Sequence, residues 1–130
     1  MLTPEYIINL VCQVLELDTD KMTIQGKQIN QKYRDARLIA IYLMRDRIYD
    51  ERMVMSKIEG KRVNVYSIKP LTYREISNAF NRKRPESAMA SYLACRDLLK
   101  TNKVFRIKYQ LAVEQLEREG SISIEKAINC

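Results

Sequence analysis

Two helix-start signals on either side of a basic turn limit the folds open to this sequence. Thr72 with Glu75 makes a capping box, in which the threonine hydroxyl accepts from the Glu75 amide and the glutamate reaches back to the helix start. Pro85 suits the first position of a second helix, because its missing N–H is not needed there. The basic run Asn81–Arg84 joins the two predicted helices, which indicates a helix-turn-helix.

Apolar residues recur at helical spacing in three other parts of the chain. Thr3 and Pro4 open a helix that is expected to end near residue 17. The longest periodic segment runs from Lys27 to about residue 48. A last amphipathic helix starts near Val104 and is expected to stop at Gly120, since glycine is common just past a helix end.

Residues 49–70 do not follow the helical pattern. Two β-prone runs, 53–55 and 63–66, lie on either side of Glu59-Gly60, which is typical of a hairpin. The predicted fold is therefore all-α, a helix-turn-helix bundle of about five to six helices with a small β-hairpin insertion. We expect one helical domain over residues 1–119, with the insertion at 49–70, followed by a short tail at 120–130.

The composition argues against several classes of function. There is no histidine, the commonest general base, which excludes Ser/His and Cys/His catalysis. The three cysteines are widely spaced and do not form a zinc-binding pattern. The three glycines are not grouped, so no phosphate-binding loop is expected. We expect a non-enzymatic protein without a metal or cofactor.

The same features indicate where the protein acts and on what. No apolar run approaches the ~18 residues of a membrane span, and the N-terminal segment lacks the basic start of a signal peptide. Scattered cysteines, odd in number, are typical of reduced thiols, so we expect a cytoplasmic protein. With 23 Lys and Arg against 16 Asp and Glu, the net charge of +7 favours a polyanionic partner, nucleic acid first.

Three stretches of the sequence, in this order, carry a resemblance to a known family. They are YIINLVCQVLELDTDKM, DARLIAIYLMRD and LTYREISNAFNRKRPESAMASYL. They resemble the C-terminal DNA-binding domain of the bacterial replication initiator DnaA, an all-α fold related to the Trp repressor. The third is similar to that family's Ser-x-x-x-Ile-Gly-x-x-Phe-Gly-Gly-Arg-Asp-His-Thr-Thr-Val signature. The resemblance covers roughly residues 6–116.

The resemblance implies a double-stranded DNA partner and assigns roles to matching positions. Arg37 matches an arginine that reaches the minor groove, residues 72–74 match a helix start that contacts the phosphate backbone, and residues 83–87 cover the segment that reads bases. By their chemistry, the cations of the turn can neutralise phosphates or meet guanine edges, and Glu86 can accept from a cytosine amino group. The candidate DNA-binding residues are Lys27, Arg34, Arg37, Thr72, Tyr73, Arg74, Arg82, Lys83, Arg84, Glu86 and Ser87.

Each of these features also has a plainer interpretation. The basic turn is equally compatible with a solvated loop, with Glu86 placed to suit the helix dipole. Lys27 and Arg34 fit the polar face of an amphipathic helix. Asn81 and Arg82 stand where the family has paired glycines, and the Asp-His pair is absent. The alternative function is therefore a protein-interaction module on the same fold, which would use the hairpin or the last helix to bind a partner.

Overall fold

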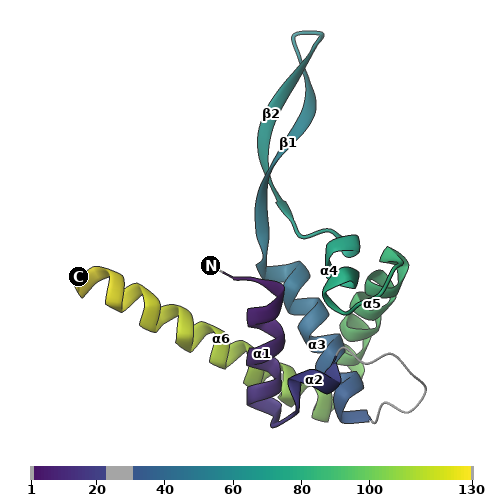
Figure 1. Ribbon diagram of the computed structural model, residues 1–130, viewed down its shortest axis with the longest axis vertical. Coiled ribbons are helices and arrows are strands. Elements are labelled where there is room, and N and C mark those ends of the chain that lie inside the picture. The colour runs from purple at the N-terminus through teal and green to yellow at the C-terminus, as the bar shows by residue number, and fades with distance from the viewer. Residues whose placement is uncertain (1, 23–30, 130) are drawn as a thin grey trace.

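The computed structural model describes residues 2–22 and 31–129 of the chain, and Figure 1 shows it as a bundle of helices with one long hairpin. The elements in order are α1 (Pro4–Leu15), α2 (Thr19–Met22), α3 (Gln31–Arg47), β1 (Tyr49–Ile58), β2 (Lys61–Pro70), α4 (Tyr73–Ala79), α5 (Pro85–Thr101) and α6 (Lys103–Asn129). The prediction of a mostly helical bundle with a hairpin insertion is confirmed.

Helix α3 is the centre of the bundle, and α1, α4 and α5 all pack against it. Its side chains Ala36, Ile39, Ala40, Leu43 and Met44 are fully buried. They recur at three- and four-residue spacing, so they form one face of the helix that the neighbouring helices cover. The two alanines allow close approach, because a methyl group adds little thickness to the contact.

The helix starts predicted at Thr3, Thr72 and Pro85 are present. The start predicted at Lys27 lies outside the described residues. Thr3 accepts a hydrogen bond from the Tyr6 amide at 3.1 Å, and Pro4 occupies the first turn of α1. The capping box of α4 has both of its bonds, with the Thr72 hydroxyl accepting from the Glu75 amide at 3.2 Å. Helix α1 ends two residues earlier than expected, because Glu16 has a left-handed φ of 58° and closes the helix.

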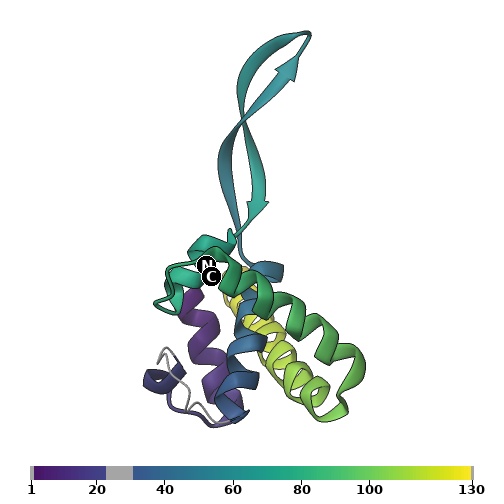
Figure 2. The ribbon, with the colours of Figure 1, turned by 90° about the vertical axis from the view of Figure 1, so that its right-hand side faces the viewer.

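The hairpin is longer than the β-prone runs indicated. Its strands pair antiparallel from Tyr49 opposite Pro70 to Ile58 opposite Lys61. Glu59 and Gly60 both have positive φ, as in the tight turns that suit the twist of a hairpin. At the base, the Leu71 amide donates to the carbonyl of Ile48 at 3.1 Å, and both of these side chains are buried. Figures 1 and 2 show the hairpin projecting from the helical body.

The expected helix stop at Gly120 is wrong. Helix α6 continues through this residue to Asn129, so residues 120–129 belong to the last helix. A glycine inside a helix costs only about 1 kcal/mol relative to alanine, and no proline follows to end the helix. Tyr6 of α1 donates to the carboxylate of Glu119, which ties α6 to the bundle just before the glycine. Beyond that point α6 extends away from the other helices (Figure 1).

Candidate nucleic-acid interface

The turn between α4 and α5 is held in place from inside the protein. Phe80 is buried at the end of α4, and Asn81 then takes a left-handed φ of 57°. The Arg82 amide donates to the Ser77 carbonyl at 2.9 Å, and the Ser77 hydroxyl donates to the Arg84 carbonyl at 2.9 Å. Ser77 is only 2% exposed, so one buried residue joins both ends of the turn, through its backbone carbonyl and its hydroxyl.

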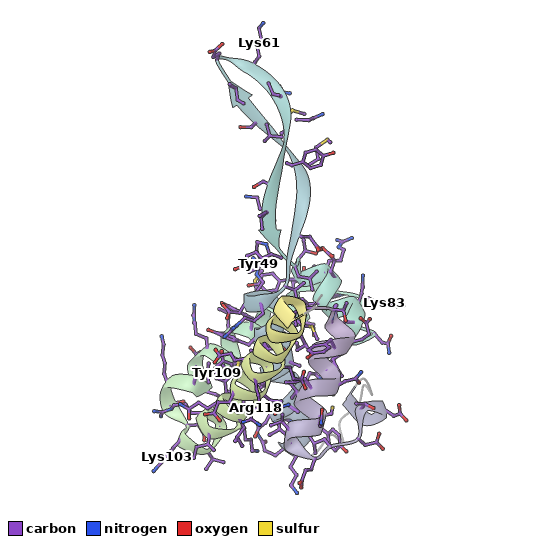
Figure 3. All side chains as sticks on the ribbon, turned by 90° about the vertical axis from the view of Figure 1, so that its left-hand side faces the viewer. Tyr49, Lys61, Lys83, Lys103, Tyr109 and Arg118 are labelled. Atoms are coloured by element: carbon purple, nitrogen blue, oxygen red, sulfur yellow. The ribbon has the colours of Figure 1, made fainter. Side chains whose placement is uncertain are left out.

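The three cations of the turn have different surroundings. Arg82 is half-buried, and its guanidinium donates to the hydroxyl of Ser87 in the first turn of α5 at 2.7 Å. Lys83 and Arg84 are exposed. Within the described residues, none of the three forms an ion pair with a carboxylate. Figure 3 shows Lys83 at the end of the helical body that carries the hairpin.

Helix α3 contributes a second pair of arginines to the same region. Arg37 is only 8% exposed, while Arg34, one turn earlier, lies at the surface. Burial, followed by repulsion from Arg82 and Arg34, lowers the pKa of Arg37 to about 10. The structure therefore brings three predicted residues from two separate segments close enough to repel one another. A cluster of this kind favours an anionic ligand, which would relieve the repulsion.

The start of α4 has a partly structural role. The Thr72 hydroxyl serves the capping box, and the half-buried ring of Tyr73 lies under the Arg45 guanidinium, 4.4 Å from its ring centroid. Tyr73 also meets the ring of Tyr92 edge-on at 6.1 Å. These contacts orient the first turn of α4 against α3 and α5. Arg74, the third predicted residue, is exposed.

The start of α5 is exposed in the way that the helix-turn-helix prediction requires. Pro85 stands in the first turn, as expected, and Arg84 at the N-cap makes no side-chain capping bond. Glu86 is exposed next to the positive end of the helix, where an acidic side chain is favourable. Lys27, the remaining predicted residue, lies outside the described part of the chain.

Sequence reasoning missed Ser77, the residue that shapes the turn. Its only signal is a hydroxyl on the same helix face as the apolar residues Ile76 and Phe80, where a polar side chain must find a partner inside the protein. It also missed the cations at the hairpin tip, Lys57, Lys61 and Arg62. Their signal is a basic flank on both sides of a predicted turn.

The two cysteines that the structure describes are core residues. Burial raises the pKa of the Cys12 thiol to about 11 and that of Cys95 to about 12, so both are neutral thiols inside the core. Among the side chains that the structure describes, no group of histidine, cysteine or acidic residues could hold a metal ion. None of the helices searched over the described residues has the length and apolar character needed to cross a membrane.

Comparisons with known proteins add no family assignment. A scan against models of known protein families finds no match, and a search of curated proteins finds no relative.

Proposed function

We propose that this protein is a non-enzymatic double-stranded DNA-binding protein that uses α4, the basic turn and α5 as a helix-turn-helix. The observation that carries the proposal is the basic turn: Arg82, Lys83 and Arg84 form no ion pair with a carboxylate in the described region. The turn also lies close enough to Arg37 for Arg82 to help lower the pKa of Arg37. Phosphates supply the missing counter-charge. This function is also the one that the sequence resemblance to the origin-binding domain of the replication initiator implies.

The exposure of each side chain indicates whether it contacts DNA or stabilises the turn. Lys83 and Arg84 are exposed and reach the phosphate backbone, together with Arg34 and Arg74. Arg82 is braced by Ser87 and holds the turn against α5. The uncapped start of α5 then faces the major groove, with Glu86 and Ser87 nearest the base edges. If about five phosphates are neutralised, the logarithm of the affinity falls with the logarithm of the salt concentration at a slope of about −4 to −5.

The test replaces the two exposed cations of the turn and keeps Arg82, which stabilises the turn. The variant Lys83→Ala/Arg84→Ala keeps Arg82 and Ser77, so the turn should keep its shape. The matched control is Lys100→Ala/Lys103→Ala, which removes the same charge from exposed positions at the end of α5 and the start of α6. Figure 3 shows Lys103 at the end of the helical body away from Lys83. Fluorescence anisotropy with a labelled mixed-sequence duplex measures affinity over a range of salt concentrations.

We expect the turn variant to bind at least about tenfold more weakly and its salt slope to be shallower by about 1.8, because two phosphate contacts are lost. The control should change the affinity by less than about twofold. The proposal fails if the wild-type protein binds no duplex at ~50 mM salt, or if both variants weaken binding equally.

One observation favours the alternative of a protein-interaction module. Met89 and Leu93 of α5, and Ile107 and Leu111 of α6, are all more than a third exposed. Apolar side chains at helical spacing on a surface can bind a partner helix. This alternative is preferred if Lys83→Ala/Arg84→Ala leaves duplex affinity unchanged.

A further inference from the structure

The hairpin contributes to something other than the core. None of its described side chains is buried, and the core residues at its base, Ile48 and Leu71, lie just outside the strands. Met53 and Tyr66, directly opposite each other in the register, are 55% and 67% exposed. An isolated two-stranded ribbon of this kind is only marginally stable in water, so its exposed faces indicate a binding partner.

The tip of the hairpin indicates the charge of that partner. Lys57 and Arg62 are opposite each other in the register, so two positive side chains share one face of the ribbon. Like charges placed directly opposite destabilise a strand pair. Lys61 adds a third cation beside the turn, and Figure 3 shows it pointing away from the tip. No described carboxylate forms an ion pair with any of the three. A polyanion would remove this repulsion.

Below the tip, the same face of the ribbon is mostly apolar. Side chains alternate between faces, so the face with Lys57 and Arg62 also carries Met55, which is opposite Asn64, and then the pair Met53 and Tyr66. An aromatic and two flexible apolar side chains next to a basic tip suit a nucleic-acid groove, where cations contact phosphates and apolar groups lie against sugars and bases. A purely apolar partner would leave the cations of the tip without a counter-charge.

The length and anchoring of the hairpin match a duplex. Each strand has ten residues, which corresponds to about 33 Å and is close to one helical turn of B-DNA. Strand β2 ends at Pro70, two residues before the Thr72 cap of α4, so the base of the hairpin is held next to the helix-turn-helix. Figure 1 shows the hairpin and α4 at the same end of the bundle.

We propose that the hairpin is a second DNA-binding element, in which Lys57, Lys61 and Arg62 contact phosphates of the duplex about one helical turn away from the site of α4 and α5. The inference rests on the proposed function, since the helix-turn-helix binds the duplex that the hairpin also contacts. The hairpin adds contacts beyond those of the helix-turn-helix, so the affinity should depend on the length of the duplex.

The test compares duplexes of two lengths with a tip variant. The variant is Lys57→Gln/Lys61→Gln/Arg62→Gln, and its control, Lys100→Gln/Lys103→Gln/Arg106→Gln, removes the same charge from exposed positions on α5 and α6. A duplex of about 12 bp accommodates the helix-turn-helix alone, and one of about 30 bp extends past the hairpin tip. Affinity and salt slope are measured on both, and hydroxyl-radical footprinting locates the protected phosphates on the longer one.

On the longer duplex, we expect the tip variant to lose about tenfold or more in affinity and its salt slope to be shallower by about 2 to 3. The footprint one turn from the main site should disappear. On the short duplex, variant and wild type should differ by less than about twofold. Glu59→Gln, which removes the acidic side chain of the turn, should strengthen binding on the longer duplex alone.

Other outcomes are equally informative. Unchanged long-duplex affinity in the tip variant, or an equal loss in the control, overturns the role of the hairpin and leaves the helix-turn-helix proposal standing. If the wild-type protein binds neither duplex, the proposed function itself is overturned. If sedimentation shows a dimer without DNA that Met53→Ser/Tyr66→Ser converts to monomer, and the tip variant still binds DNA normally, the hairpin face belongs to a second copy of this chain.

Discussion

At the scale of single residues, the candidate site combines side chains that stabilise the fold with side chains that strain it. Ser77 and Arg82 stabilise the turn through hydrogen bonds to the Arg84 carbonyl and to Ser87. Arg37 has the opposite character, since its pKa is lowered to about 10 by burial and by neighbouring arginines. A lowered arginine pKa means that the folded state disfavours the charged form. This unfavourable interaction is therefore present at neutral pH, where the guanidinium is protonated, and it diminishes only as the pH rises through about 10.

The substitution Arg34→Gln tests whether repulsion between Arg34 and Arg37 destabilises the fold. Removing the exposed guanidinium relieves part of the repulsion on Arg37, so thermal unfolding should show an unchanged or slightly higher Tm, by about 1–2 °C. Duplex affinity should fall by about three- to tenfold, with the salt slope shallower by about 0.9. Lys100→Gln is the control and should change neither quantity. A clear loss of stability would show that Arg34 supports the fold.

At the scale of secondary-structure elements, the hairpin and the helical bundle are separable. The bundle closes beneath the hairpin through the Leu71 amide and the Ile48 carbonyl, and Arg45 reinforces this junction by donating to the Leu71 carbonyl at 2.6 Å. The contacts that close the bundle beneath the hairpin therefore come from residues outside β1 and β2. This arrangement fits an element that serves binding.

Replacing residues 50–69 by Asn-Gly tests the separation. Tyr49 and Pro70 are opposite each other in the register, so a two-residue turn of this type can join them. Because Ile48 and Leu71 are retained, we expect cooperative thermal unfolding by circular dichroism, with a Tm within about 5 °C of wild type. Non-cooperative melting would contradict the separation and would show that the hairpin is part of the folding unit.

At the scale of the whole molecule, α6 is joined to α3 by a partly buried ion pair. The Lys108 ammonium lies 2.9 Å from the carboxylate of Asp35, which is only 7% exposed, and Gln31 donates to the same carboxylate at 2.7 Å. A buried carboxylate needs these partners, because an unpaired charge in the interior is strongly unfavourable. The pair fixes α6 relative to the α3 arginines of the candidate site.

Lys108→Met should lower the free energy of unfolding by about 1–3 kcal/mol, less than for a fully buried pair because the lysine side chain is partly exposed. Asp35→Asn in the same chain should recover part of that loss, since the neutral amide no longer needs the lysine. Urea denaturation of the two single variants and the double variant gives the coupling energy. Additive effects would mean that the two residues do not interact in solution.

The local signals of the sequence were sufficient for the starts of α4 and α5 and for the hairpin turn. The capping box at Thr72, Pro85 at the start of α5 and the Glu59-Gly60 turn each act over a few residues, and all three predictions are confirmed. Ala88 and Cys95 are both buried, and their spacing places them on one face of α5. Gly120 was misleading because a glycine near a helix end does not by itself stop the helix.

Only the tertiary structure could show how distant segments meet. Arg37 and Arg82 are far apart in the sequence, yet the packing of α3 against α4 and α5 brings their charges together. The Asp35–Lys108 pair likewise joins α3 and α6 through residues that are 73 positions apart in the sequence. Helix caps and turns are determined by neighbouring residues, whereas the environment of a charge is determined by whichever elements pack around it. The residue pattern therefore predicted where α4, α5 and the hairpin turn begin, whereas the arrangement of charges at the site depends on how the elements pack together.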